Sequence, residues 1–244
     1  MNLYVVTGTT RGLGKALADR IALDPGNELI AIARAPAGAI PGGVRIEADL
    51  SDVAALELAC DALEGRIRGK AYLKAVLVNN AGIVDPVGPL GSLEDGALGS
   101  HLVVNLVTPV LLMNRFLRMT EAVPLRRVIN ISSGAGRRPV AGWTAYCTGK
   151  AGLDMASRVL ALEASQRGAA IQVTSLAPGV LDTHMQEVVR AIPDSRFADV
   201  ARFRQLKDEG ALRDPGEIAA QILEFESAGK LTEPVMDLRE LAKA

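Results

Sequence analysis

The sequence has few aromatic residues, few cysteines and few histidines. Aromatic side chains make up 3% of the 244 residues, so a hydrophobic core must be built from Ala, Val, Leu and Ile. The two cysteines, Cys60 and Cys147, lie far apart, which argues against a disulfide framework and favours a reducing, cytoplasmic compartment. The two histidines, His101 and His184, lack metal-ligand spacing, so we expect no metal site.

Long runs of one kind of residue are also missing. The net charge is -1 without a charge run, so nothing indicates binding to nucleic acid or to an acidic membrane surface. No unbroken apolar run approaches the roughly 18 residues of a membrane helix, and no basic leader with a cleavage site is visible. Hydrophobic residues make up 49% of the chain, and no repeat or linker interrupts it, so we expect residues 1–244 to form one domain.

The sequence does contain short apolar runs that alternate with helical patterns. The runs that predict strands lie at residues 3–6, 29–33, 44–48, 75–78, 127–131 and 171–176. Helical patterns lie at 13–21, up to 63, 97–119, 144–167 and 215–226, and we expect Pro109 to bend the third of them. This alternation predicts an α/β fold with a doubly wound parallel sheet covered by helices on both faces. Of the remaining stretches, we expect 88–99 to be a loop and 182–207 to cover a substrate.

A glycine-rich loop follows the first predicted strand and opens the first helix. Residues 7–14 read T-G-T-T-R-G-L-G, which has the spacing G-x-x-x-G-x-G. Glycines let the backbone approach a pyrophosphate, and a helix N-terminus offers free N–H groups. This context predicts a dinucleotide-binding loop made of Gly8, Thr10, Arg11, Gly12, Leu13 and Gly14.

A basic residue, Arg34, ends the second predicted strand. An NAD site has an acidic residue in this region, which binds the ribose 2′-hydroxyl. Two guanidinium groups, those of Arg34 and Arg11, suit a 2′-phosphate instead, so we predict NADP(H) as the cofactor. The alternative is that Arg34 is a solvated charge at a strand end.

Tyr146 and Lys150 are four residues apart in a predicted helix, so their side chains share one face. A tyrosine titrates near ~10, and a neighbouring ammonium favours the phenolate, so we expect a lowered tyrosine pKa and a general acid that works near neutral pH. An isolated Tyr-x-x-x-Lys is usually an ordinary helix pair. The glycine loop upstream favours the catalytic interpretation here.

The order and spacing of the motifs resemble those of the short-chain dehydrogenase/reductase family. The resemblance covers roughly residues 3–183 and rests on Gly8, Gly12, Gly14, the run Asn79-Asn80-Ala81-Gly82, Asn105, Ser133, Tyr146, Lys150 and Pro178-Gly179. Within the family, residues 142–186 are most similar to sepiapterin reductase and benzil reductase-like members. Those enzymes use NADPH to reduce a side-chain ketone or one carbonyl of a vicinal dicarbonyl.

The resemblance implies roles for particular residues. The implied catalytic set has Tyr146 as proton donor, Lys150 as the group that lowers its pKa and holds the ribose, and Ser133 as the group that orients the carbonyl. Asn105 would support a water in the proton relay; its alternative is a satisfied core amide. The implied cofactor contacts outside the glycine loop are Arg34, Asp49, Leu50, Asn80, Ala81, Gly82, Tyr146, Lys150, Pro178, Gly179, Val180 and Thr183. Asp49 and Leu50 would hold the adenine, although Ser51 or Asp52 can also cap the next helix.

Four further residues are candidates for substrate contact, namely Trp143, Asp182, His184 and Asp237. Trp143 would either wall the pocket or pack in the core. Asp237 is similar to an acid that anchors the substrate in sepiapterin reductases, with an uncertain register, and its alternative is a surface acid. We expect His101 to be an ordinary surface or core residue.

Together these inferences predict an NADPH-dependent carbonyl reductase that acts on a small-molecule ketone or vicinal dicarbonyl. The resemblance also implies a homodimer or homotetramer. The alternatives are an NADP-dependent alcohol, hydroxysteroid or sugar dehydrogenase that works oxidatively, and a non-catalytic NADP-binding sensor. Such sensors typically lack the tyrosine or the lysine, and this sequence has both.

Overall fold

The described residues of the computed structural model, 1–34 and 42–241, contain a seven-stranded parallel sheet. Its order is β3-β2-β1-β4-β5-β6-β7, with every neighbouring pair parallel. The strands are β1 (Asn2–Thr7), β2 (Asn27–Ala33), β3 (Gly43–Glu47), β4 (Lys74–Asn79), β5 (Leu125–Ile131), β6 (Ile171–Ala177) and β7 (Val235–Asp237). The chain reverses its direction of strand addition between β3 and β4, as in a Rossmann fold, which confirms the predicted doubly wound architecture.

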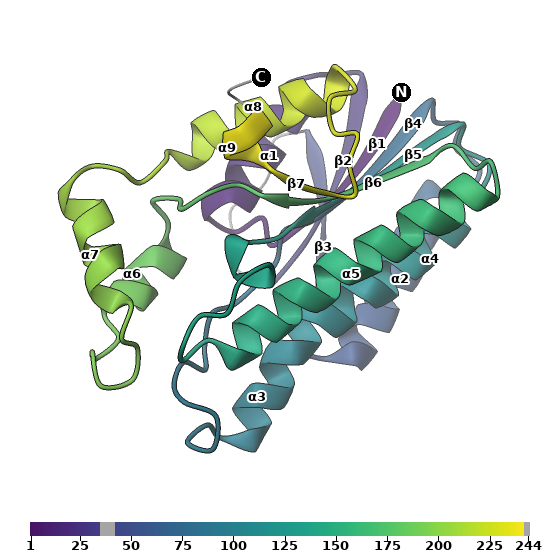
Figure 1. The fold of residues 1–244 in the computed structure, drawn as a ribbon. Coiled ribbons are helices and arrows are strands. Elements are labelled where there is room, and N and C mark those ends of the chain that lie inside the picture. The colour runs from purple at the N-terminus through teal and green to yellow at the C-terminus, as the bar shows by residue number, and fades with distance from the viewer. Residues whose placement is uncertain (35–41, 242–244) are drawn as a thin grey trace.

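Helices cover both faces of the sheet (Figure 1). One face carries α1 (Gly12–Ala22) and α8 (Pro215–Ser227), and the other carries α2 (Val53–Ile67), α4 (Thr108–Met119) and α5 (Thr144–Gln166). Successive β1 residues supply the two cores in turn. Leu3 and Val5 pack toward α2, α4 and α5, whereas Tyr4 and Val6 pack toward α1 and α8. A strand buried on both faces therefore reads as a continuous apolar run, which is how the six longer strands were predicted.

The long predicted helix at 97–119 has three parts. It begins as α3 (Asp95–Leu102), passes through a π-helical turn at η1 (Val103–Val107), and continues as α4. The irregular turn lies just before Pro109, whose ring cannot follow a regular preceding turn. The expected loop at 88–99 is wrong for residues 95–99, because the helix starts at Asp95.

By length and composition, the helical stretch Asp95–Met119 is the one part of the described chain that could cross a membrane. In this fold only one side of the stretch packs into the core. Leu112 and Phe116 are fully buried against the sheet and its neighbouring helices.

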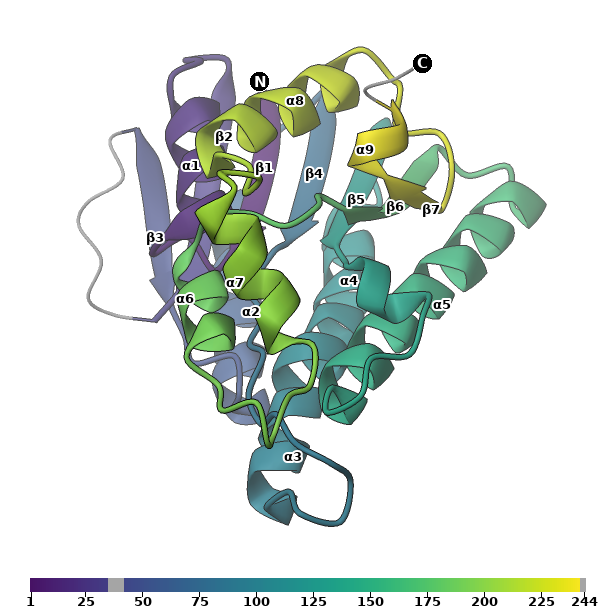
Figure 2. The same cartoon turned by 60° about the vertical axis from the view of Figure 1, so that its left-hand side comes forward.

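Two short helices, α6 (His184–Arg190) and α7 (Val200–Asp208), lie within the segment expected to cover a substrate. They stand side by side, away from the helices that cover the sheet (Figures 1 and 2). The base of this segment is closed where Asp182 N–H donates to the Arg213 carbonyl at 2.9 Å and Arg213 N–H donates to the Val180 carbonyl at 3.0 Å. The segment is thus a closed excursion beyond the end of β6.

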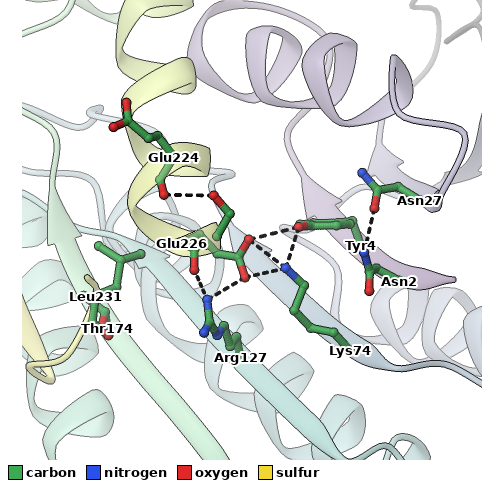
Figure 3. A network of polar contacts seen from close by, with 10 residues as sticks. Asn2, Tyr4, Asn27, Lys74, Arg127, Thr174, Glu224, Glu226 and Leu231 are labelled. Atoms are coloured by element: carbon green, nitrogen blue, oxygen red, sulfur yellow. Dashed lines mark hydrogen bonds and ion pairs between the residues drawn. The ribbon is translucent and has the colours of Figure 1, made fainter. Parts of the chain in front are cut away.

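A buried ion-pair network fastens α8 to the amino-terminal ends of three strands (Figure 3). The Glu226 carboxylate accepts from Lys74 Nζ at 2.8 and 2.9 Å, from Arg127 Nη1 at 2.8 Å, and from Tyr4 Oη at 3.0 Å. The Glu226 side chain is 1% exposed, and those of Lys74 and Arg127 are 15% and 13% exposed. Burial and the adjacent carboxylate raise the pKa of Tyr4 well above its ordinary value, so its hydroxyl stays a donor.

Candidate active site

A cavity of about 680 Å³ opens at the carboxyl ends of the strands. Parallel strands all point their carboxyl ends to the same edge, and ligands of this fold class bind there. The glycine loop and the ends of β2, β4, β5 and β6 form its walls, and α6 and α7 cover one side. Nearly all the predicted site residues meet here; Asn105, Asp182 and Asp237 are not among the lining residues.

The glycine loop is packed too closely for side chains. A Cβ on Gly14 would lie 2.2 Å from both the Gly8 carbonyl oxygen and Asn80 Nδ2. Gly8 has φ +71°, which a side chain would strain. Asn80 Nδ2 donates to the carbonyls of Thr7 and Gly8 at 2.9 and 3.1 Å, which ties the end of β4 to the loop. The result is a bare backbone cradle at the start of α1, which fits a dinucleotide pyrophosphate.

The Asn-Ala pair after β4 is held by one hydroxyl. The backbone N–H groups of Asn80 and Ala81 both donate to Thr7 Oγ1 at 3.0 Å. A Cβ on Gly82, next in the chain, would lie 3.1 Å from Asn105 Oδ1 and 3.6 Å from Lys150 Nζ. Small residues therefore let this segment pass between the cradle and the lysine.

Two arginines flank the far end of the cavity. Arg11 precedes α1 and Arg34 ends β2; both are exposed and both line the cavity. Asp49 lies on the same side, where the Ser51 backbone N–H and hydroxyl, and then Arg34, hold the pKa of its carboxyl below the usual range. Asp52 caps α2 by accepting from Ala54 N–H at 2.9 Å, which settles the choice between the two capping candidates.

Tyr146 and Lys150 face the cavity from adjacent turns of α5. The Lys150 ammonium lies 5.7 Å from the Tyr146 ring centroid and donates to the Ile131 carbonyl at 2.8 Å. Both side chains are buried, at 8% and 5% exposed. Ser133, after β5, lines the same part of the cavity, and its hydroxyl is near enough to the phenol to affect the pKa of Tyr146. The three predicted residues therefore share one wall.

The expected lowering of the Tyr146 pKa is wrong for this structure. Burial raises the pKa of Tyr146 above its ordinary value, and the hydrogen bond from Ser133 only partly opposes this. Burial likewise lowers the pKa of Lys150 to about 8, although the charge of Asp154 opposes that shift. Desolvation is the main cause of both pKa shifts, and the raised pKa keeps Tyr146 a protonated phenol at neutral pH.

Asn105 lies in the π-helical turn behind the cavity wall, and its amide is fully engaged. Its Oδ1 accepts from Ile83 N–H at 3.0 Å, and its Nδ2 donates to the Ile83 carbonyl at 2.8 Å. Pro109 has no N–H, so the α-helical bond to the Asn105 carbonyl cannot form. Its two bonds to the Ile83 backbone hold the segment after β4 in place. The remaining contact of the amide is with His101, whose Nε2 lies 2.6 Å from Asn105 Nδ2.

The substrate side of the cavity is mostly apolar and aromatic. Trp143 stacks on Phe197 at 4.8 Å between centroids and contacts Tyr146 edge-on at 5.1 Å, so it is both core and wall. Exposed His184 also lines the cavity, and its Nδ1 contacts Glu187 Oε2 at 2.9 Å.

Two of the predicted substrate residues point elsewhere. Asp182 pairs with Lys207 at 2.7 Å, outside the cavity lining. Asp237 is buried and accepts from the Arg239 guanidinium at 2.6 and 2.9 Å, and Arg239, not Asp237, is among the residues that line the cavity. The structure therefore does not support either acid as a substrate contact.

Sequence reasoning missed several cavity residues. The described residues that line the substrate side without having been predicted include Val84, Val140, Gln186, Arg202, Phe203 and Arg239. They come from segments without a motif, and the fold alone brings them together. His101 is not among the lining residues, and it is fully buried, which agrees with the expectation of a core residue.

The fold and the site define a nicotinamide-dinucleotide-dependent oxidoreductase, and comparison with known families agrees. The short chain dehydrogenase family model matches residues 2–193, and the chain belongs to this family. A benzil reductase ((S)-benzoin forming) of Bacillus subtilis (strain 168) is 35% identical over 242 residues, which cover 98% of this chain and 99% of the relative. Sepiapterin reductase of Meriones unguiculatus is 35% identical over 240 residues, with 90% and 88% coverage.

A solved structure is similar as well. A short-chain dehydrogenase/reductase from Burkholderia vietnamiensis is 32% identical, with a TM-score of 0.66 over 81% of this chain and 95% of that chain. The predicted family, and the resemblance to its sepiapterin and benzil reductase members, are confirmed.

Proposed function

We propose that this protein is an NADPH-dependent carbonyl reductase that acts on a ketone or a vicinal dicarbonyl. The observation that carries the proposal is a buried Tyr146 that shares one cavity wall with Ser133 and Lys150, next to the glycine cradle. The apolar substrate side suits a hydrophobic carbonyl compound. The names of the relatives, benzil reductase and sepiapterin reductase, support the same substrate class.

The mechanism assigns one task to each residue. When bound, the reduced nicotinamide supplies a hydride to the carbonyl carbon. Ser133 donates a hydrogen bond that orients the carbonyl oxygen, and Tyr146 gives its phenolic proton to that oxygen. Lys150, one turn away, stabilises the phenolate that remains. A raised Tyr146 pKa suits this direction, because the proton donor must be protonated before the reaction.

The proposed function is tested by following NADPH absorbance with benzil, a simple aliphatic diketone and sepiapterin. We expect consumption of NADPH with at least one of the three, and formation of the corresponding hydroxyketone or alcohol. Full occupancy by NADPH without consumption in the presence of any of these carbonyls would contradict the proposal and favour a binding protein.

The preference for NADPH rests on Arg11 and Arg34. For Arg34→Asp, we expect the ratio of kcat/KM with NADPH to that with NADH to fall about 10- to 100-fold, since a hydrogen bond to a charged group contributes ~1.5–3 kcal/mol. The measurement is steady-state kinetics with both cofactors. Arg167→Asp, the same change at an exposed site outside the cavity lining, is the control and should leave the ratio unchanged. An unchanged ratio in Arg34→Asp would remove this arginine from the 2′-phosphate site.

The assembly that we propose is a homodimer, or a homotetramer that contains it. Helix α5 exposes Met155, Val159 and Leu162 on one stripe, at 59%, 46% and 59%, and neighbouring α4 exposes Val110 and Leu111. Exposed apolar side chains gathered on two neighbouring helices are typical of an interface between copies.

We expect the double variant Val159→Glu and Leu162→Glu to halve the mass measured by sedimentation equilibrium, because the added charges repel across a twofold axis. Leu58→Glu, on α2, is the control, since Leu58 is equally apolar and 71% exposed. A wild-type chain that sediments as a monomer would refute the proposed assembly.

A further inference from the structure

His101 is fully buried at the C-terminal end of α3, with 0% of its surface exposed. Its Nδ1 lies 2.7 Å from the Asp85 carbonyl oxygen, and its Nε2 lies 2.6 Å from Asn105 Nδ2. The edge of its ring contacts Tyr146, with 6.1 Å between centroids and an interplanar angle of 79°. One buried histidine thus touches both the phenol of the site and the clamped asparagine.

The partners of His101 fix where its proton lies. A carbonyl oxygen only accepts, so Nδ1 must carry the hydrogen, and Nε2 of the neutral ring must then accept from the Asn105 amide. Burial, and the nearby charge of Lys150, lower the pKa of His101 below its ordinary value, which keeps the ring neutral. The imidazole therefore links a donor contact on one side to an acceptor contact on the other.

This arrangement also fixes Asn105. Its two amide hydrogens go to the Ile83 carbonyl and to His101, and its oxygen accepts from Ile83 N–H. Because Nε2 carries a lone pair, a flipped amide would place its oxygen against the two acceptors, the Ile83 carbonyl and Nε2, and its NH₂ group against the Ile83 N–H. The segment from Ile83 to Asp85, which lines the cavity, is therefore held at one end by Asn105 and at the other by His101.

We propose that His101 is a positioning residue for the catalytic centre, which sets the orientation of Asn105 and holds the segment 82–85 against Lys150 and Tyr146. The path to the lysine is short, since the site of a Cβ on Gly82 lies 3.1 Å from Asn105 Oδ1 and 3.6 Å from Lys150 Nζ. If the segment 82–85 is misplaced, the groups that surround the Lys150 ammonium move with it. Displacements of about 1 Å near a catalytic group can lower the rate of the catalysed reaction about 10²-fold. This role rests on the proposed function.

Two near-isosteric variants separate the two contacts. His101→Gln places an acceptor oxygen near the position of Nε2 but loses the donor to Asp85, and His101→Asn keeps the donor but loses the acceptor for Asn105. We expect kcat to stay within about threefold for His101→Gln and to fall about tenfold or more for His101→Asn, because only the latter frees the amide. His101→Phe, which keeps a ring against Tyr146, should resemble His101→Asn. In all three, the KM for NADPH should change less than about twofold.

A purely structural role predicts a different pattern. In that case the Tm of each variant would fall according to the contacts that it has lost, and kcat per folded enzyme would be equal in all three variants. That result would overturn the proposal. A His101→Asn enzyme as active as the wild type, or more active than His101→Gln, would overturn it as well.

A spectroscopic measurement tests the same geometry without activity. The chain has only two histidines, so imidazole ¹⁵N spectra contain two sets of signals, and His184→Gln assigns them. We expect His101 to be the Nδ1–H tautomer at pH 7, and a proton on Nε2 would overturn the proposal. If this tautomer is found but the wild type reduces no carbonyl, the proposed function is refuted, whereas the hydrogen-bonded arrangement of His101, Asn105 and Ile83 is supported.

Discussion

Replacing Tyr146 by phenylalanine should abolish turnover and leave NADPH binding nearly intact. The change removes only the hydroxyl, so the ring still packs against Trp143 and His101. Without the phenolic proton the carbonyl oxygen has no general acid. General acid catalysis contributes about 10²- to 10⁴-fold, so we expect kcat to fall by that much. The measurements are NADPH consumption for turnover and fluorescence titration for the dissociation constant of NADPH.

The matched control is Tyr72→Phe. Tyr72 is also buried, and its hydroxyl donates to Glu28 at 2.8 Å, but it lies outside the cavity lining. This variant should keep the wild-type kcat. If Tyr146→Phe retained more than about a tenth of the wild-type kcat, another group would have to deliver the proton.

Replacing Glu226 by alanine should destabilise the fold more than any other change considered above. The variant leaves Lys74 and Arg127 buried without their shared carboxylate, and leaves the Tyr4 hydroxyl without its acceptor. Breaking a buried ion pair from one side costs about 3–5 kcal/mol, so we expect the free energy of unfolding to fall by that amount. Urea or thermal denaturation followed by circular dichroism measures it.

Glu224→Ala provides the comparison for Glu226→Ala. Glu224 lies on the same helix, α8, but is exposed, so its loss should change the free energy of unfolding by less than about 0.5 kcal/mol. The network lies at the opposite edge of the sheet from the cavity, so folded Glu226→Ala enzyme should keep the wild-type KM for NADPH. Equal stability of the two variants would mean that the network contributes no net stability.

The sequence predicted those parts of the molecule that depend on local pattern. Six strands could be predicted because each is an apolar run bounded by turn residues, and the glycine loop because its context is strand, loop and helix. Tyr146, Lys150 and Ser133 followed from spacing together with a family resemblance. Strand β7 was not predicted because its three residues are too few to show an alternating pattern of apolar and polar residues.

What could not be predicted depends on contacts between distant segments. The direction of the Tyr146 pKa shift was wrong because it depends on burial, which spacing does not reveal. Asp237 and Arg239 are two residues apart, and only the folded chain shows that the arginine, and not the acid, reaches the cavity. Beyond residue 186, where the resemblance to sepiapterin and benzil reductases ends, the cavity lining from α6 and α7 has no motif.

The excursion that carries α6 and α7 begins and ends at the same place, where the backbones of Val180, Asp182 and Arg213 bond to each other. A segment whose two ends are already joined can be exchanged as a unit, provided that its replacement reproduces this base and the packing of Phe197 and Phe203 on Trp143. Residues 184–212 from a related enzyme could thus be transplanted while the sheet, the glycine loop with Thr183, and the proton donor stay as they are. The fold thus places the glycine loop and the proton donor on the sheet and α5, and the cavity residues of α6 and α7 on a segment with a single attachment to β6.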